Sequence, residues 1–165
     1  MTTQDERLGR VTEVPAGVQV QFRRRWPDPI ADVWAALTEP DRAARWFGRY
    51  DGERRVGGSG TLTMTHEEGS TGEPMRIVEC DAPRRLVVQW ESEQAWRIEL
   101  DLAEEGDGTV LLFTQVFPPG TDAGDYELGW HWYLDMLDAE VSGTPGPGGW
   151  ETFLAATGPA YGRSS

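Results

Sequence analysis

Residues 18–47 read VQVQFRRRWPDPIADVWAALTEPDRAARWF, and the hydrophobic period changes once within this stretch. Apolar and polar side chains alternate as far as Trp26, which is typical of a strand with one buried face. From residue 30 the apolar side chains recur instead at the spacing of a helix. Pro40 interrupts this helix, and a second short helix follows it. The stretch therefore predicts one strand followed directly by two short helices.

The chain on both sides of this stretch predicts further strands. Residues 9–14 suit a short partner strand for residues 18–26. After residue 47, glycines and prolines recur at the intervals of hairpins, and no crossover helix fits between them, so the strands should be antiparallel. The pattern leaves the inward face of residues 75–80 open. The segments expected as strands are residues 61–66, 75–80, 86–90, 96–102 and 110–117.

A longer helix is expected after the sheet, over residues 125–142, and Gly143 should end it. Its expected buried stripe is Tyr126, Trp130, Tyr133, Leu134, Leu137 and Val141. The whole chain, residues 1–165, is expected to form one domain. Its expected divisions are a loose N-terminus (1–10), the fold proper (11–143), a Pro/Gly linker (144–149) and a C-terminal helical turn with a polar tail (150–165).

The charge of the chain limits its partners. Its 165 residues include 28 acidic and 15 basic side chains, which gives a formal net charge of −13. Such a negative body repels nucleic acids and anionic lipid surfaces, so neither is expected as a partner. All the basic residues are arginines, which excludes Schiff-base catalysis and the phosphate-loop lysine. Because no apolar run could span a bilayer and the N-terminus lacks a secretory signal, a cytoplasmic protein is expected.

Five short motifs carry a resemblance to a known family. They are WAALTEP with RWF (residues 34–40 and 45–47), VGG (56–58), PRRLVVQW (83–90), GTVLL (108–112), and GW (129–130) with Leu134 and Leu137. In this order they resemble the activator-of-heat-shock-ATPase homology family, a branch of the START-like (SRPBCC) superfamily, over roughly residues 18–155. The resemblance implies an α+β, helix-grip (START-like) fold, in which a curved antiparallel sheet wraps around a long C-terminal helix and two short helices follow the first strand.

The same resemblance implies an apolar cavity between the sheet and the C-terminal helix. Relatives in the superfamily bind lipids, hormones or polyketides, and a minority catalyse reactions. The eight tryptophans of this chain would suit a pocket for an apolar or amphipathic small molecule, although the rings could instead simply fill the gap. The apolar candidates for the cavity wall are Trp46, Met64, Trp90, Trp96, Ile98, Phe113, Trp130 and Leu134.

Four polar residues are candidates for contacts with the head of such a ligand. Arg24, His66 and Gln115 share the parity of the apolar side chains on their strands, and Tyr133 lies on the stripe of the long helix. A buried guanidinium needs carboxylates, carbonyls or water, so Arg24 either has such partners or extends from the strand end to solvent. His66 and Gln115 could equally be the last residues of strands that emerge into loops.

The sequence gives little support for catalysis. His66 and His131 lie far apart and form no local metal motif, and the single cysteine, Cys80, is expected to be a buried structural thiol. No catalytic residue, metal site or cofactor is therefore predicted, and the sequence favours a non-catalytic or weakly catalytic protein over an enzyme. A cyclase or hydrolase that uses His66 or His131 as an acid or base is the enzymatic alternative.

A protein-interaction module, such as a co-chaperone that binds a heat-shock ATPase, is the alternative from another class. It predicts a filled interior and an exposed apolar patch. Val110, Leu112 and Val116 would lie on the outer parity of their strand, where they would mark either this patch or a homodimer interface. A small hydrophobic molecule is the leading expectation for the partner.

Overall fold

Eight strands form a single antiparallel sheet in the computed structural model, which describes residues 7–65, 71–91 and 96–161. The first long strand, β2, pairs with the last strand, β8, and the sheet continues from β8 through consecutive hairpins to β3 at the far edge. This order confirms the predicted antiparallel sheet. The strands are β1 (Arg10–Val14), β2 (Gly17–Trp26), β3 (Gly48–Gly52), β4 (Ser59–Met64), β5 (Glu73–Asp81), β6 (Arg85–Trp90), β7 (Arg97–Glu105) and β8 (Gly108–Phe117).

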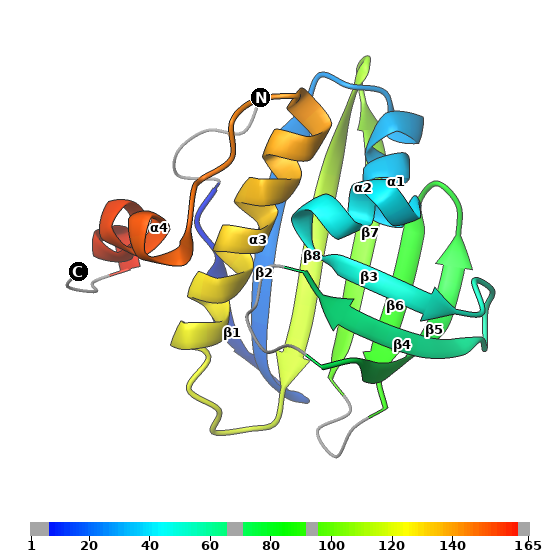
Figure 1. Ribbon diagram of the computed structural model, residues 1–165. Helices are drawn as coiled ribbons and strands as arrows, with labels where there is room; N and C mark the ends of the chain where they lie inside the picture. The colour runs from blue at the N-terminus through cyan, green and yellow to red at the C-terminus, as the bar shows by residue number, and fades with distance from the viewer. Residues whose placement is uncertain (1–6, 66–70, 92–95, 162–165) are drawn as a thin grey trace.

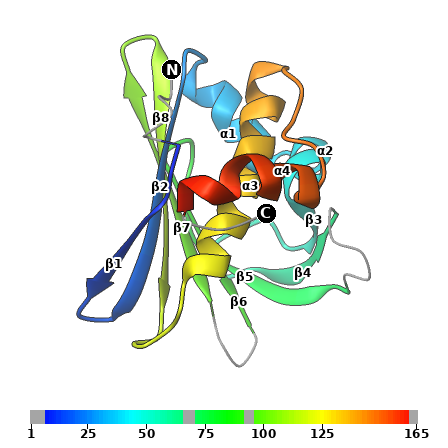
Figure 2. The same ribbon diagram turned by 90° about the vertical axis from the view of Figure 1, so that its left-hand side faces the viewer.

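The helices are α1 (Ile30–Thr38), α2 (Pro40–Trp46), α3 (Gly124–Ser142) and α4 (Trp150–Thr157), and a 3-10 turn (Gly158–Tyr161) follows them. The chain passes from β2 to β3 through α1 and α2, and α3 lies across one face of the sheet (Figure 1). Figure 2 shows the sheet bending around α3, with β1 and β2 at one end of the bend and β3 and β4 at the other. The predicted α+β helix-grip fold is therefore confirmed. Among the described residues, no helix combines the length and the hydropathy needed to cross a membrane.

The long helix α3 is buried on more sides than its predicted stripe. Leu134 and Leu137 are buried as predicted, whereas Tyr126 is exposed, and His131 and Trp132, which lie outside the predicted stripe, are buried. The reason is α4, which lies beside α3 on the side away from α1 and α2 (Figure 1). The ring centroid of Phe153 lies 5.4 Å from that of His131, and the ring centroid of Trp150 lies 5.5 Å from that of Trp132. The C-terminal segment thus buries a second face of α3.

A buried ion cluster joins α3 to the sheet. The side chain of Arg24 on β2 is fully buried, and its Nη1 donates to Asp135 Oδ1 at 2.8 Å and to Asp138 Oδ2 at 2.6 Å. Arg7 bridges the same two carboxylates, at 2.5 and 2.7 Å, and its carbonyl accepts a hydrogen bond from Arg24 Nη2. Arg24 therefore has carboxylate partners, and the interpretation that it extends to solvent is wrong.

The Asp135 carboxylate should make stability depend on pH. Burial alone would raise its pKa, but the hydrogen bond from His131 and the charges of Arg24 and Arg7 outweigh burial and hold the pKa below its ordinary value of 3.8. The folded protein then binds fewer protons than the unfolded chain near that pH, so this stabilisation is present above the ordinary pKa and is lost as the pH falls through the folded pKa.

We therefore expect the stability advantage of the wild type over Asp135→Asn to shrink as the pH falls from about 6 to about 3, measured by urea denaturation. Asp107, which is exposed in the turn between β7 and β8, offers the matched control. The difference between the wild type and Asp107→Asn should change less over the same range, because Asp107 lies outside the buried ion cluster. A constant difference for Asp135→Asn would contradict the prediction.

An irregularity in β5 determines which of its side chains face inward, which the sequence pattern left open. The register with β6 shifts between Ile77 and Glu79, which is a β-bulge. Because one extra residue reverses the alternation beyond it, Cys80 returns to the face that already carries Met75 and Ile77. Cys80 is exposed, so the prediction of a buried structural thiol is wrong.

Candidate ligand cavity

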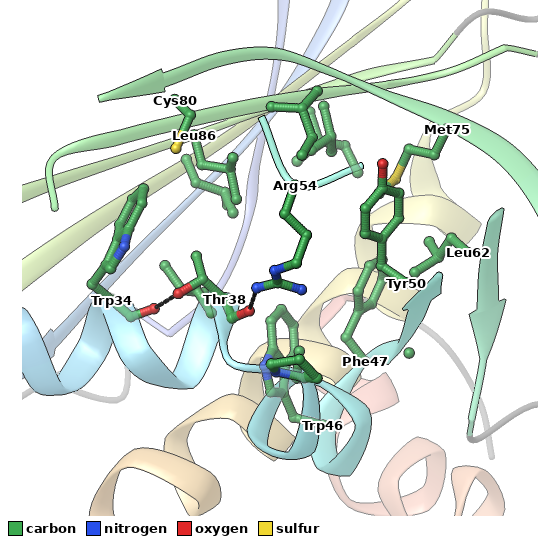
Figure 3. Close-up of a pocket in the computed structure, with 18 of the residues that line it drawn as sticks. Trp34, Thr38, Trp46, Phe47, Tyr50, Arg54, Leu62, Met75, Cys80 and Leu86 are labelled. Carbon is green, nitrogen blue, oxygen red and sulfur yellow. Dashed lines mark hydrogen bonds between the residues drawn. The ribbon is translucent and has the colours of Figure 1, made fainter. Parts of the chain in front are cut away.

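A cavity of about 300 Å³ lies between the curled part of the sheet and the helix pair α1–α2 (Figure 3). Its helical wall comes from Trp34, Leu37, Thr38, Pro40, Ala43 and Trp46. Its sheet wall comes from Gly48, Tyr50, Leu62, Met75, Ile77, Cys80, Leu86, Val88, Ile98, Leu100 and Phe113. Phe47, Arg54, Ala82 and Trp130 complete the lining. The wall is thus mostly apolar and includes several aromatic rings.

The cavity lies where the helices leave space against the sheet unfilled. Under α3 the interior is filled by rings, because Trp130 packs against Phe113 with centroids 4.7 Å apart and Tyr133 packs against Phe47 at 5.6 Å. The helices α1 and α2 are short, and the hydrogen bond from Trp46 Nε1 to the carbonyl of Ala36 ties the end of α2 to α1 at 2.8 Å. The open space therefore lies beneath the helix pair, whereas the sequence placed it beneath the C-terminal helix, which contributes only Trp130 to the described lining.

Two polar side chains of the lining, those of Thr38 and Arg54, meet at the end of α1. The Thr38 hydroxyl donates to the carbonyl of Trp34 at 2.8 Å, and the Thr38 carbonyl accepts a hydrogen bond from Arg54 Nη2 (Figure 3). The Tyr50 hydroxyl donates to the carbonyl of Glu53 at 2.7 Å. Burial of the phenol, followed by the nearby charge of Glu53, raises the pKa of Tyr50, so this hydroxyl is neutral near neutral pH. The site therefore offers one positive charge, that of Arg54, beside neutral polar groups.

Four of the twelve candidate site residues line this cavity: Trp46, Ile98, Phe113 and Trp130. The candidates that lie outside its lining are Arg24, Met64, Trp90, Trp96, Gln115, Tyr133 and Leu134. His66 lies outside the described residues.

The three described polar candidates do not converge on a ligand head. Arg24 belongs to the ion cluster, Gln115 accepts a hydrogen bond from Trp130 Nε1 at 2.7 Å, and Tyr133 packs among aromatic rings. Gln115 supports the cavity wall indirectly, because it holds the Trp130 indole.

Arg54, Tyr50 and Cys80 line the site but are not predicted by the sequence patterns. Arg54 lies in the loop after β3, a strand that the periodicity does not predict, and two consecutive arginines in a turn are ordinarily solvated. Cys80 reaches the cavity only because of the bulge in β5. No sequence signal identifies which loop or strand end lies over a cavity.

The described lining includes no histidine, aspartate or glutamate, and its titratable side chains are Tyr50, Arg54 and Cys80. His131, the described candidate for an acid or base, is buried elsewhere. Its Nδ1 lies 2.7 Å from the Tyr161 hydroxyl, which accepts from the backbone N–H of Gly9, and its Nε2 lies 3.5 Å from Asp135 Oδ1. Burial raises the pKa of Tyr161, which keeps this phenol protonated. No three histidine, cysteine or acidic side chains among the described residues are grouped to hold a metal.

Solved structures resemble this one over most of its length. The crystal structure of CalU16 from Micromonospora echinospora is 33% identical, with a TM-score of 0.66, and the match covers 80% of this chain and 82% of that chain. The protein encoded by gene BPP1335 from Bordetella parapertussis is 25% identical, with a TM-score of 0.74, over 94% of this chain and 90% of that chain. DynU16, a protein of the dynemicin biosynthetic locus, shares the fold at 22% identity and a TM-score of 0.67, over 77% and 48%.

A family model completes the comparison. No curated protein matches the chain. The model described as activator of Hsp90 ATPase homolog 1-like protein matches residues 28–142, which include the helix pair, the sheet from β3 to β8 and α3. The match agrees with the resemblance seen in the sequence motifs, and it covers more than half of the chain. The chain therefore belongs to the activator of Hsp90 ATPase homolog 1-like family.

Proposed function

We propose that the protein binds a small, mostly apolar molecule in the cavity beneath α1 and α2. The observation that carries the proposal is a cavity of about 300 Å³ with a mostly apolar, partly aromatic lining. This volume lies at the lower end of the ~300–1,000 Å³ typical of ligand pockets, which favours a compact ligand. Each 100 Å² of apolar ligand surface removed from water contributes roughly 2.5 kcal/mol, before the costs of association.

The shape of the lining favours a ligand with a flat body. The rings of Trp46 and Phe47 stack with centroids 5.1 Å apart, and the Trp130 ring lies 5.6 Å from that of Phe47. Trp34 and Tyr50 also border the space (Figure 3). Rings in these positions offer both faces and edges to an aromatic or polycyclic guest.

The observed surface gives less support to a protein-interaction module. Such a module would need a contiguous apolar patch. The exposed large hydrophobic residues of the described chain are Val11, Val56, Tyr126 and Trp150, which lie in β1, in the loop between β3 and β4, in α3 and in α4. Val110, Leu112 and Val116 are only half-buried, but polar residues of neighbouring strands share the outer face with them, including the Arg85 cluster with Glu99 and Asp101. Ligand binding is therefore the function that we propose.

The single cysteine offers a direct test, because Cys80 lines the cavity and is exposed. We expect 1-N-phenylnaphthylamine, a neutral apolar dye, to gain fluorescence on binding and to slow alkylation of Cys80 by iodoacetamide at least about tenfold at saturation, since an occupied fraction of nine-tenths leaves one-tenth reactive. The alkylation rate is measured by mass spectrometry.

The control is the same alkylation of the protein unfolded in urea, where the dye should have no effect on the rate. Fluorescence gain without protection of Cys80 would place the dye elsewhere, and the absence of both effects would contradict ligand binding in this cavity.

A further inference from the structure

Arg54 is the only charged residue in the described lining of the cavity. It lies in the loop between β3 and β4, and its side chain extends into the space bordered by Thr38, Trp46 and Tyr50 (Figure 3). The residue is exposed, so its guanidinium stays in contact with water while it borders the apolar interior. One cation at the edge of an apolar cavity would suit a ligand that has a charged end and an apolar body.

The guanidinium of Arg54 has no carboxylate partner among the described residues. Its hydrogen bond goes to the carbonyl of Thr38, whereas the neighbouring arginines are both paired: Arg49 with Asp51, and Arg55 with Glu53. The nearest acidic side chain along the chain, that of Glu53, is thus engaged by Arg55. A guanidinium has five N–H donors in a planar fork, so one bond to a carbonyl leaves most of its donors available.

We propose that the ligand carries a single anionic group, such as a carboxylate, and that Arg54 binds this group at the edge of the cavity. The inference rests on the proposed function, because it adds a head group to the apolar ligand. The apolar lining could not hold a charge without a partner, so the anion has to stay where Arg54 and water can solvate it. A carboxylate matches the guanidinium fork with two parallel hydrogen bonds, and the apolar body would extend inward past Trp46 and Phe47.

A purely structural role for Arg54 makes a different prediction. Thr38 is the last residue of α1, so the bond from Arg54 also places a positive charge at the C-terminal end of that helix. If this were its only role, removing the charge would lower the stability of the protein and would weaken the binding of neutral and anionic ligands equally. A ligand-binding role instead affects anionic ligands selectively.

The test uses two dyes with the same ring system, neutral 1-N-phenylnaphthylamine and anionic 8-anilinonaphthalene-1-sulfonate. Arg54→Gln removes the charge, and Arg49→Gln is the matched control, since Arg49 is exposed, lies on the adjacent strand β3 and does not line the cavity. We expect Arg54→Gln to reduce the affinity for the anionic dye about tenfold or more and the affinity for the neutral dye less than about twofold, because only the anionic dye can form a charge-assisted pair with Arg54. Arg49→Gln should change neither affinity, and Arg54→Lys should restore part of the affinity for the anionic dye.

Carboxylate recognition is tested by competition. Octanoate should displace the neutral dye from the wild type at lower concentration than 1-octanol does, and this preference should disappear in Arg54→Gln. Equal losses for both dyes, equal effects of Arg54→Gln and Arg49→Gln, or no preference for octanoate would overturn the inference while leaving an apolar ligand site intact. If the neutral dye neither binds nor protects Cys80 in the wild type, the proposed function itself fails, and the inference fails with it.

Discussion

Replacing Arg24 with alanine should lower the free energy of unfolding by about 3–5 kcal/mol, because it removes one partner of a buried ion cluster. The guanidinium is fully buried and lies between Asp135 and Asp138, which are themselves mostly buried. Without it, both carboxylates would remain at the junction of β2 and α3 with Arg7 as their remaining arginine partner. Because Arg7 is partly exposed and still bridges both, the loss should fall in the lower part of this range.

The neighbouring residue gives the control for this variant. Arg23 is exposed on the other face of the same strand, so Arg23→Ala should change the free energy of unfolding by less than about 0.5 kcal/mol. Both variants are compared with the wild type by urea denaturation. Equal losses for Arg24→Ala and Arg23→Ala would show that the cluster adds nothing to stability beyond an ordinary surface charge.

Local patterns were sufficient to predict most of the elements. Alternation predicted β2, the switch of period predicted α1, and Gly143 ends α3 in the left-handed conformation, with φ of 68°, as a C-terminal glycine should. The strand β3 was not predicted, because its sequence GRYDG has two glycines and no alternation of apolar residues. It forms because β4 pairs with it along its whole length. Tertiary pairing here overrides the local preference.

The site was harder to predict than the fold, because its location depends on gaps between elements. The sequence indicates which side chains face inward, and Trp46, Ile98 and Phe113 do line the cavity. It does not indicate whether a given ring fills its surroundings or leaves space beside it. That difference depends on how far the sheet curls and on how short α1 and α2 are. Arg54 could not be distinguished from Arg55 for the same reason, since only the path of the loop separates them.

Ala43→Phe should reduce the affinity for 1-N-phenylnaphthylamine at least about tenfold, because the new ring would occupy part of the space that the dye needs. Ala43 lies on α2 and lines the cavity, whose volume of about 300 Å³ leaves room for a phenyl ring but not for that ring and a three-ring dye together. The substituted residue lies on α2, so the side chains of the sheet wall are unchanged. Affinity is measured by fluorescence titration of the wild type and the variant.

Ala31 on the adjacent helix provides the matched substitution, since it is exposed and does not line the cavity. Ala31→Phe should leave the affinity within about twofold, and circular dichroism should show that both variants are folded. In Ala43→Phe, Cys80 should also lose its protection by the dye at concentrations that protect the wild type. If Ala43→Phe binds the dye as the wild type does, the dye occupies another site. The apolar cavity beneath α1 and α2 would then not explain its binding, because a ligand site of this size cannot accept both the ring and the dye.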